Sequence, residues 1–192
     1  MNIRQLSVSY VPEQDRLLLK VNTAASEEIR LWLTRRLMTG LWPLLNQLSG
    51  QQILQLEAAN ASLAPADDGL KKMLIDFRKE QLLRETDFDT PFEDAAAALP
   101  LGPEPLLVTD IDASPLSGGG IALHFHERQK DREQRGFRMQ MEPRLIQGLM
   151  HLVEKALARS QWSDAFPSAL AADDASLAGA HRLGTDRPKY LN

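Results

Sequence analysis

Hydrophobic residues in the first third of the chain change their spacing near residue 35. Every second residue from Ile29 to Leu33 is aliphatic, and Arg30 and Trp32 lie between them. This two-residue period is typical of a strand with one buried face. The apolar residues then recur at the spacing of one helical face, at Leu37, Leu41, Leu44, Leu45 and Leu48. The pattern therefore predicts a strand that runs almost directly into a helix.

Two further strands are expected before this unit. Residues 6–10 alternate aliphatic or aromatic side chains with polar ones, and Leu17, Leu19 and Val21 form the inward face of a second strand. Polar turns separate these segments from each other and from the strand that begins near Ile29. Short connections favour antiparallel neighbours, so we expect a meander of three strands followed by one helix.

The same order of elements returns in the second half of the chain. Three segments expected as strands and then a helical stripe follow one another, at residues 107–112, 121–125, 137–141 and 145–157. Pro143 is well placed for the first turn of the helix, where no backbone donor is needed. We therefore expect a second unit of three strands and a helix.

The residues between the two units have a different character. Helical spacing continues from residue 51 to 86, with a linker at 61–69 in which Asp67 or Asp68 is a candidate N-cap. Residues 87–105 are rich in proline, which predicts an irregular connection.

The two strand-to-helix units also match residue by residue when Ile29 is aligned with Phe137. The identical pairs are Arg30/Arg138, Arg36/Arg144, Leu37/Leu145, Gly40/Gly148, Leu41/Leu149 and Leu44/Leu152. We interpret the two halves as an internal duplication related by a pseudo-twofold axis. Unrelated meanders with similar helices are the alternative.

Each of the two expected helices carries a glycine at the matching position, Gly40 and Gly148. A glycine inside a helix costs about 1 kcal/mol relative to alanine, so a repeated glycine indicates a close approach of two backbones. We expect the helices to cross at these glycines. Alternatively each glycine permits a local bend, and Pro43 predicts a kink or break near Gly40.

The pattern as a whole predicts an α+β fold of two tandem β-β-β-α repeats, with an antiparallel sheet or sheets and packed helices. The expected divisions of this one compact unit are residues 1–50 for the first repeat, 51–105 for a helical insert with the proline-rich connection, 106–160 for the second repeat and 161–192 for a weakly ordered tail. Whether the six strands form one sheet or two is left open.

Composition narrows the class of protein. Of the 192 residues, 43% are hydrophobic and 25% are charged, as in ordinary globular proteins, and the net charge of -4 argues against a dedicated nucleic-acid binder. The chain has no cysteine, which excludes disulfides and thiolate ligands. Because neither a signal segment nor a membrane-spanning run is found, we expect a cytoplasmic protein without a membrane partner.

One candidate site is formed by Asp110, Asp112, His124 and His126. Each pair flanks a core residue, so both pairs should point outward on one face if their strands form a hairpin. Carboxylate and imidazole groups are ligands for divalent metals. The sequence places no third ligand, and exposed strands carry such residues without any function. Metal binding is therefore a subordinate hypothesis, and no cofactor is otherwise expected.

A second candidate site consists of Arg30, Trp32 and Arg138 on the outward faces of their strands, with Arg36 and Arg144 near them. Guanidinium groups beside an exposed aromatic ring can bind single-stranded nucleic acid, although such arginines also pair with carboxylates for packing alone. The strand-then-helix repeats resemble the Whirly and Pur-alpha families, which have four strands per repeat where three are expected here. Their resemblance is one of topology.

No catalytic or nucleotide-binding motif occurs in the sequence. We therefore expect a non-enzymatic binding or adaptor protein that acts through protein–protein contacts, either with another protein or as a homodimer. Single-stranded nucleic-acid binding is the alternative. Trp162, Phe166 and Leu170 have the spacing of a docking helix, but covering the chain's own core is their commoner role.

Overall fold

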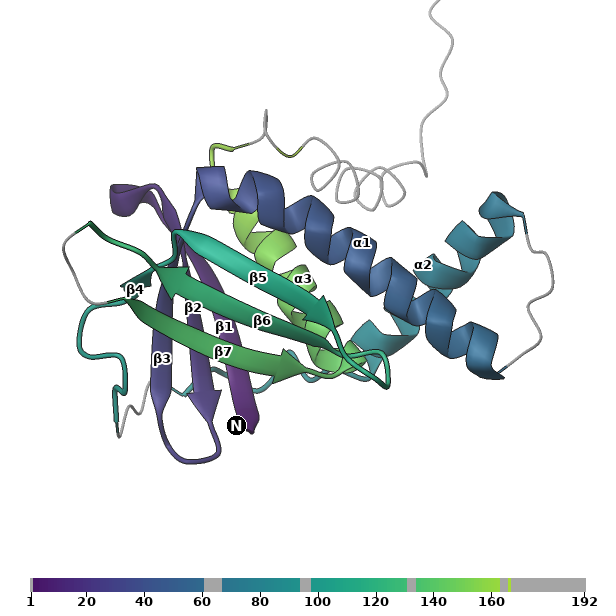
Figure 1. Ribbon diagram of the computed structural model, residues 1–192, viewed down its shortest axis with the longest axis horizontal. Coiled ribbons are helices and arrows are strands. Elements are labelled where there is room, and N and C mark those ends of the chain that lie inside the picture. Colours follow the sequence, from purple (N-terminus) through teal and green to yellow (C-terminus); the bar gives the residue numbers. More distant parts are fainter. Residues whose placement is uncertain (1, 61–66, 94–97, 131–133, 163–165, 167–192) are drawn as a thin grey trace, which may run out of the picture.

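The computed structural model describes residues 2–60, 67–93, 98–130, 134–162 and 166. Within these parts of the chain, seven strands form two sheets and three α-helices accompany them (Figure 1). The strands of the two sheets run in crossed directions in this view. The predicted α+β class is confirmed.

The first sheet has the order β1-β2-β3-β4. Its strands are β1 (Ile3–Val11), β2 (Arg16–Thr23), β3 (Glu28–Thr34) and the short β4 (Leu106–Leu107). The first three are antiparallel neighbours, as the alternating pattern and short turns predict, and a 3-10 turn at Pro12–Gln14 joins the first two. The fourth strand pairs parallel to β3, an arrangement that the pattern did not predict.

The second sheet has the order β5-β6-β7 and is antiparallel throughout. Its strands are β5 (Asp110–Pro115), β6 (Ile121–Glu127) and β7 (Arg135–Met141). The turn between the first two contains Gly118 and Gly119, both with φ above +80°, a conformation that favours glycine. The six principal strands therefore form two sheets, which settles the question that the sequence left open.

Residues 107–112, expected as one strand, are shared between the two sheets. The Val108 amide donates to the carbonyl of Trp32 in the first sheet (3.1 Å), and the Thr109 amide donates to the carbonyl of His126 in the second (2.8 Å). Successive residues of an extended chain point in opposite directions, so two neighbours can bond to two sheets. This crossing point ties the sheets together.

The helices are α1 (Arg35–Asn60), α2 (Asp68–Arg84) and α3 (Pro143–Arg159). As predicted, α1 begins directly after β3, and Pro143 lies in the first turn of α3. The predicted N-cap is Asp67, whose side chain accepts from the Leu70 amide at 2.8 Å. Although Pro43 lies inside α1, the helix continues unbroken past it. Both halves thus have three strands and a helix in the same order, whereas their common origin stays a prediction.

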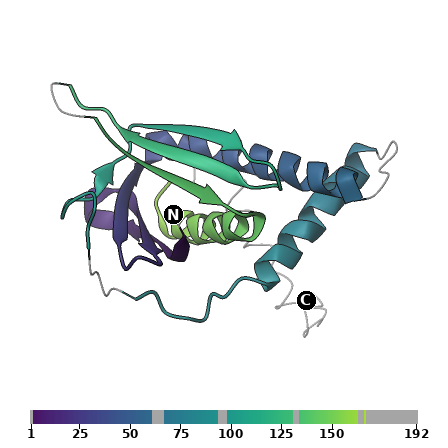
Figure 2. The ribbon, with the colours of Figure 1, turned by 60° about the horizontal axis from the view of Figure 1, so that its bottom comes forward.

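One hydrophobic core is shared by both sheets. It contains alternate residues of β2 and β3, of β6 and β7, and one face each of α1 and α3. In Figure 2, α3 lies under the second sheet, and α2 with the far half of α1 extends beyond the sheets. Trp162 and Phe166 belong to this core, which confirms their expected role as its cover; Leu170 lies outside the described residues.

The expected crossing of the helices at Gly40 and Gly148 is wrong. Gly40 is exposed, and a Cβ atom there would meet nothing within 4 Å. Gly148 is buried, but a Cβ there would lie 3.2 Å from the methyl group of Thr86. The helices α1 and α3 instead meet at Ser49 and Gln147, whose buried side chains share a hydrogen bond. The core turns one face of α1 inward, and Gly40 lies on the other face.

No helix in the described part of the chain has the length and apolar character needed to cross a membrane.

We expect Gly40→Ala to stabilise the protein, because Gly40 is an exposed helical glycine with free space around it. The gain in unfolding free energy should approach about 1 kcal/mol, the difference in helix propensity, and urea denaturation measures it. Gly148→Ala is the matched variant, and its gain should be smaller or negative because Thr86 has to move. A loss of stability in Gly40→Ala would contradict this description of the helix surface.

Candidate functional site

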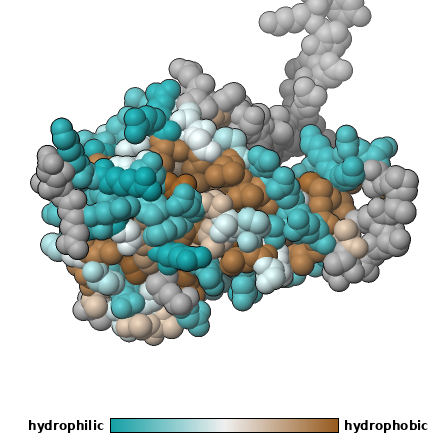
Figure 3. All heavy atoms as spheres, viewed as in Figure 1, coloured by the Kyte–Doolittle hydropathy of each residue, from teal (hydrophilic) through white to brown (hydrophobic). Residues whose placement is uncertain are grey.

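The outward face of the second sheet carries the polar residues that the alternation predicts. Strand register places Asp112, His124 and Arg138 in one row across the sheet, since His124 is the direct partner of both others. The next row contains His126 and, opposite it on β7, Gly136. Much of this face is hydrophilic in Figure 3, whereas hydrophobic side chains follow the course of α1 beside it.

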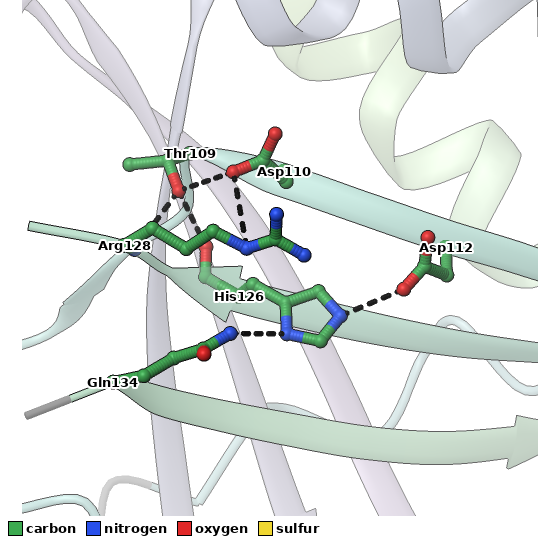
Figure 4. A network of polar contacts seen from close by, with 6 residues as sticks. All are labelled: Thr109, Asp110, Asp112, His126, Arg128 and Gln134. Atoms are coloured by element: carbon green, nitrogen blue, oxygen red, sulfur yellow. Dashed lines mark hydrogen bonds and ion pairs between the residues drawn. The ribbon is translucent and has the colours of Figure 1, made fainter.

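Three of the four predicted metal ligands converge on this face. Asp112, His124 and His126 each offer one ligand atom, and these atoms all lie within 4.8 Å of one another. Asp112 Oδ2 lies 2.8 Å from His126 Nε2 (Figure 4), and the two imidazole centroids are 3.8 Å apart. The sequence placed the four residues as two pairs on a common face. The fold brings three of these residues together, and we call them the Asp112/His124/His126 cluster.

His126 is the best supported member of the cluster. Its side chain is only 9% exposed, and Gln134 Nε2 lies 3.3 Å from its Nδ1 atom (Figure 4). When the Gln134 amide donates to Nδ1, the Nε2 proton is the one donated to Asp112. Both nitrogens of the ring are thus held, and the ring orientation is fixed before any ligand arrives. No pattern in the sequence pointed to Gln134, which lies in the loop between β6 and β7.

Gly136 makes room for the two imidazoles. A Cβ atom at this position would lie 3.1 Å from the carbonyl oxygen of Phe125 and 3.3 Å from His124 Nε2. Both distances are tighter than ordinary contacts, so a larger residue would displace the backbone or the His124 ring. A glycine inside a strand often marks such a close approach, and this was the signal in the sequence that could have found it.

Asp110, the fourth predicted ligand, is engaged elsewhere. Its Oδ2 atom accepts a hydrogen bond from Thr109 Oγ1 at 2.8 Å and lies 3.8 Å from Arg128 Nε (Figure 4). The Thr109 hydroxyl in turn accepts from the Arg128 amide at 3.0 Å. This second network holds the start of β5 against the end of β6, and it meets the Asp112/His124/His126 cluster at the backbone carbonyl of His126, which accepts from Thr109 Oγ1 at 3.1 Å.

The cluster favours a neutral His124. Its partial burial, followed by the neighbouring His126, lowers the pKa of His124, and Arg138 and Arg128 act in the same direction. Asp112 is the one neighbour that raises it. A neutral imidazole is the form that binds metal ions, because the nitrogen lone pair is then free.

The predicted arginine face is divided by the fold. Arg30 and Trp32 lie on β3 in the first sheet, whereas Arg138 lies on β7 in the second. Arg30 Nε is 3.2 Å from the buried carboxylate of Glu28, and Trp32 is half-buried. Because both sheets turn their apolar faces to the same core, their outward faces point away from it in different directions. The structure does not bring these residues together.

The remaining predicted arginines lie apart from both sheet faces. Arg36 is exposed in the first turn of α1, and Arg144 is exposed in the first turn of α3. The Arg144 guanidinium donates to the carbonyl of Glu85 at 3.4 Å. It also borders a groove between β1, residues 86–93 and the start of α3, which contains no residue of the Asp112/His124/His126 cluster.

Part of the outward face of the first sheet is covered by residues 91–93. Gln5 Nε2 donates to the carbonyl of Pro91 at 3.1 Å, and Asn22 Nδ2 donates to that of Glu93 at 2.8 Å. The Lys20 ammonium lies 5.6 Å from the centre of the Phe92 ring. The strand face that carries Arg30 is therefore already occupied near Lys20.

The helix α2 leaves an apolar stripe exposed. Leu70, Met73 and Phe77 are 54%, 69% and 62% exposed, and no residue of this helix is fully buried. The opposite side of α2 is attached to α1, where Arg78 Nε lies 2.7 Å from Glu57 Oε1. The helical spacing of these residues was expected from the sequence, whereas the exposure of the stripe was visible only in the structure.

Comparison with known proteins adds no further guide: no family model, curated protein or solved structure matches this chain.

We expect the imidazole of His124 to titrate below the ordinary range of histidine in the metal-free protein. Asp112→Asn should lower this pKa further, because it removes the only neighbour that raises it, and Arg138→Gln should raise it. NMR titration of the histidine side chains measures all three. Opposite shifts in the two variants are required; equal or absent shifts would contradict the arrangement.

The same shift has a consequence for stability. Because the pKa of His124 is lowered in the folded protein, the unfolded chain binds a proton more readily at this residue. Acidification through the unfolded pKa therefore lowers the free energy of unfolding, and the lost stability returns as the pH rises.

Proposed function

We propose that this protein binds a divalent transition-metal ion at Asp112, His124 and His126. The observation that carries the proposal is the convergence of three ligand atoms, from two strands, within 4.8 Å of one another. Two imidazoles and one carboxylate suit zinc and other first-row ions better than magnesium or calcium, which prefer oxygen ligands alone.

One pair of ligand atoms already lies near the spacing that a metal requires. Zinc binds nitrogen and oxygen at about 2.0–2.2 Å, so neighbouring ligand atoms of a tetrahedral site lie about 3.3 Å apart. His126 Nε2 and Asp112 Oδ2, now 2.8 Å apart, would separate slightly as the ion replaces the shared proton. Asp112 has the freedom for this movement, since its side chain is 76% exposed.

The surroundings support binding in two further ways. His126 and His124 project from one rigid strand whose alternate residues, Leu123 and Phe125, are buried in the core. Gln134 can accept a hydrogen bond from Nδ1 of the metal-bound His126 once its side-chain amide has turned over, which is the usual outer-shell support of a histidine ligand.

We expect zinc to bind at one-to-one stoichiometry and to shift the His124 and His126 resonances while leaving His151 unchanged. His151 is the internal control because it lies on α3, outside the cluster, where its ring contacts Phe88. Loss of a supporting residue alone costs about 10- to 100-fold in affinity, so His126→Gln, which removes a ligand, should weaken zinc binding by at least about 100-fold. Isothermal titration calorimetry measures the affinity.

Two more variants sharpen the zinc experiment. Asp110→Asn lies on the same sheet face outside the cluster and should bind zinc as the parent protein does. Gly136→Ala should bind more weakly because the added methyl group displaces His124. Unchanged resonances of His124 and His126 at saturating zinc would end the proposal.

A second candidate function is association through the exposed stripe of α2, in line with the expected protein–protein contacts. The occupant we propose is a second copy of the chain. Leu70 and Phe77 lie on either side of Met73 at helical spacing, so an antiparallel pair of α2 helices centred near Met73 brings Leu70 of one copy to Phe77 of the other. All three side chains are exposed in the single chain.

Light scattering at two concentrations tests this association. The mass of the parent protein should rise with concentration, and the double variant Met73→Glu, Phe77→Glu should remain monomeric because it places charges in the apolar contact. Both residues are exposed, so the variant should keep its unfolding free energy within about 0.5 kcal/mol of the parent. A monomeric mass for the parent at both concentrations would refute self-association.

A further inference from the structure

We infer that the metal ion held by the Asp112/His124/His126 cluster takes a phosphate group as its remaining ligand, with Arg138 as the second contact of that group. This inference rests on the proposed metal binding. It assigns the chemical class of ligand, a free phosphate or a phosphate monoester, to the same sheet face.

The cluster leaves a coordination position of the ion open. Zinc and similar ions take four or more ligands, and three protein ligands are typical of sites that keep one position for water or substrate. Within the described residues the cluster has three members, of which Asp112 is exposed and His124 half-buried. The remaining position therefore faces outward from the sheet, where a ligand from solution can reach it.

The charge around the ion favours an anionic ligand. One carboxylate, Asp112, leaves a divalent ion with a net charge of about +1, since both imidazoles bind as neutral groups. Arg138 adds a positive charge in the same row of the sheet, and both it and Arg128 act electrostatically on His124. Asp110 lies beside Arg128 and offsets the positive charge of that arginine. The charge of Arg138 has no such carboxylate beside it among the described residues.

Arg138 is also available for a ligand. It is exposed, and its guanidinium makes no ion pair or hydrogen bond within the described residues. A net charge near +2, from the ion and this guanidinium together, matches a phosphate dianion better than a carboxylate monoanion. The planar fork of arginine presents two parallel donors that fit two phosphate oxygens.

Arg138 lies beside the cluster on the neighbouring strand. Directly opposed residues on neighbouring strands have Cβ atoms about 4.5–5.5 Å apart, which places the long side chain of Arg138 beside His124. Two residues earlier on the same face of β7 is Gly136, whose missing side chain leaves room for the His124 imidazole, so Arg138 is the side chain that β7 places in the row of His124. One phosphate oxygen can thus bind the ion while two others face Arg138.

The test measures phosphate binding by calorimetry, using the full chain loaded with one equivalent of zinc. Inorganic phosphate should bind to the zinc-loaded protein and not to the metal-free protein, and acetate should bind at least about ten-fold more weakly than phosphate. A simple phosphate monoester, phenyl phosphate, forms the second arm and shows whether an esterified phosphate is accepted as well as the free ion.

Arg138→Gln should leave zinc affinity within about two-fold and weaken phosphate binding by about ten-fold or more, as expected for a lost charge-assisted contact. Arg36→Gln, an exposed arginine on α1, is the matched control and should change neither. Zinc binding without phosphate binding, or equal phosphate binding in Arg138→Gln, overturns this inference and leaves the metal site standing. Absence of zinc binding overturns both.

Discussion

Each sheet of this protein has a single apolar face, and the two faces are buried in one common core. Neither sheet could remove its apolar residues from water alone, because helices α1 and α3 cover only part of what the strands present. Burial of a large aliphatic or aromatic side chain stabilises a fold by about 1.5–3 kcal/mol. The apolar side chains that face the core therefore determine the strand register. The outward residues follow from that choice.

The Asp112/His124/His126 cluster depends on this constraint. A slip of one residue would turn Phe125 and Leu123 outward and the histidines into the core, which the burial energy forbids. With the register fixed, His124 and His126 must point outward from β6, and Asp112 must stand opposite His124. The cluster is therefore held by the core behind it, and its own contacts, such as that between His126 and Gln134, only adjust the ring orientation.

The same constraint separates the arginines. Arg30 and Arg138 occupy matching positions in two similar units, yet the units contribute to two sheets whose outward faces diverge from the core. On the first sheet, Glu28 lies beside Arg30, and residues 91–93 cover part of the face. On the second sheet, Arg138 lies next to His124 and has no such cover among the described residues. Similar local sequence has thus produced two chemically different surfaces.

The sequence by itself determined the six principal strands, the helices that follow them, an N-cap at Asp67 or Asp68 and the outward direction of the two aspartates and two histidines. These features depend on neighbours along the chain: alternation, helical spacing and short turns. The division of residues 106–115 between two sheets, the exposed position of Gly40 and the contact of Ser49 with Gln147 depend on how α1 and the sheets turn toward the core. Only the tertiary structure decided that Asp112 joins the histidines while Asp110 joins Arg128, because that selection depends on strand register and on contacts between segments distant in sequence.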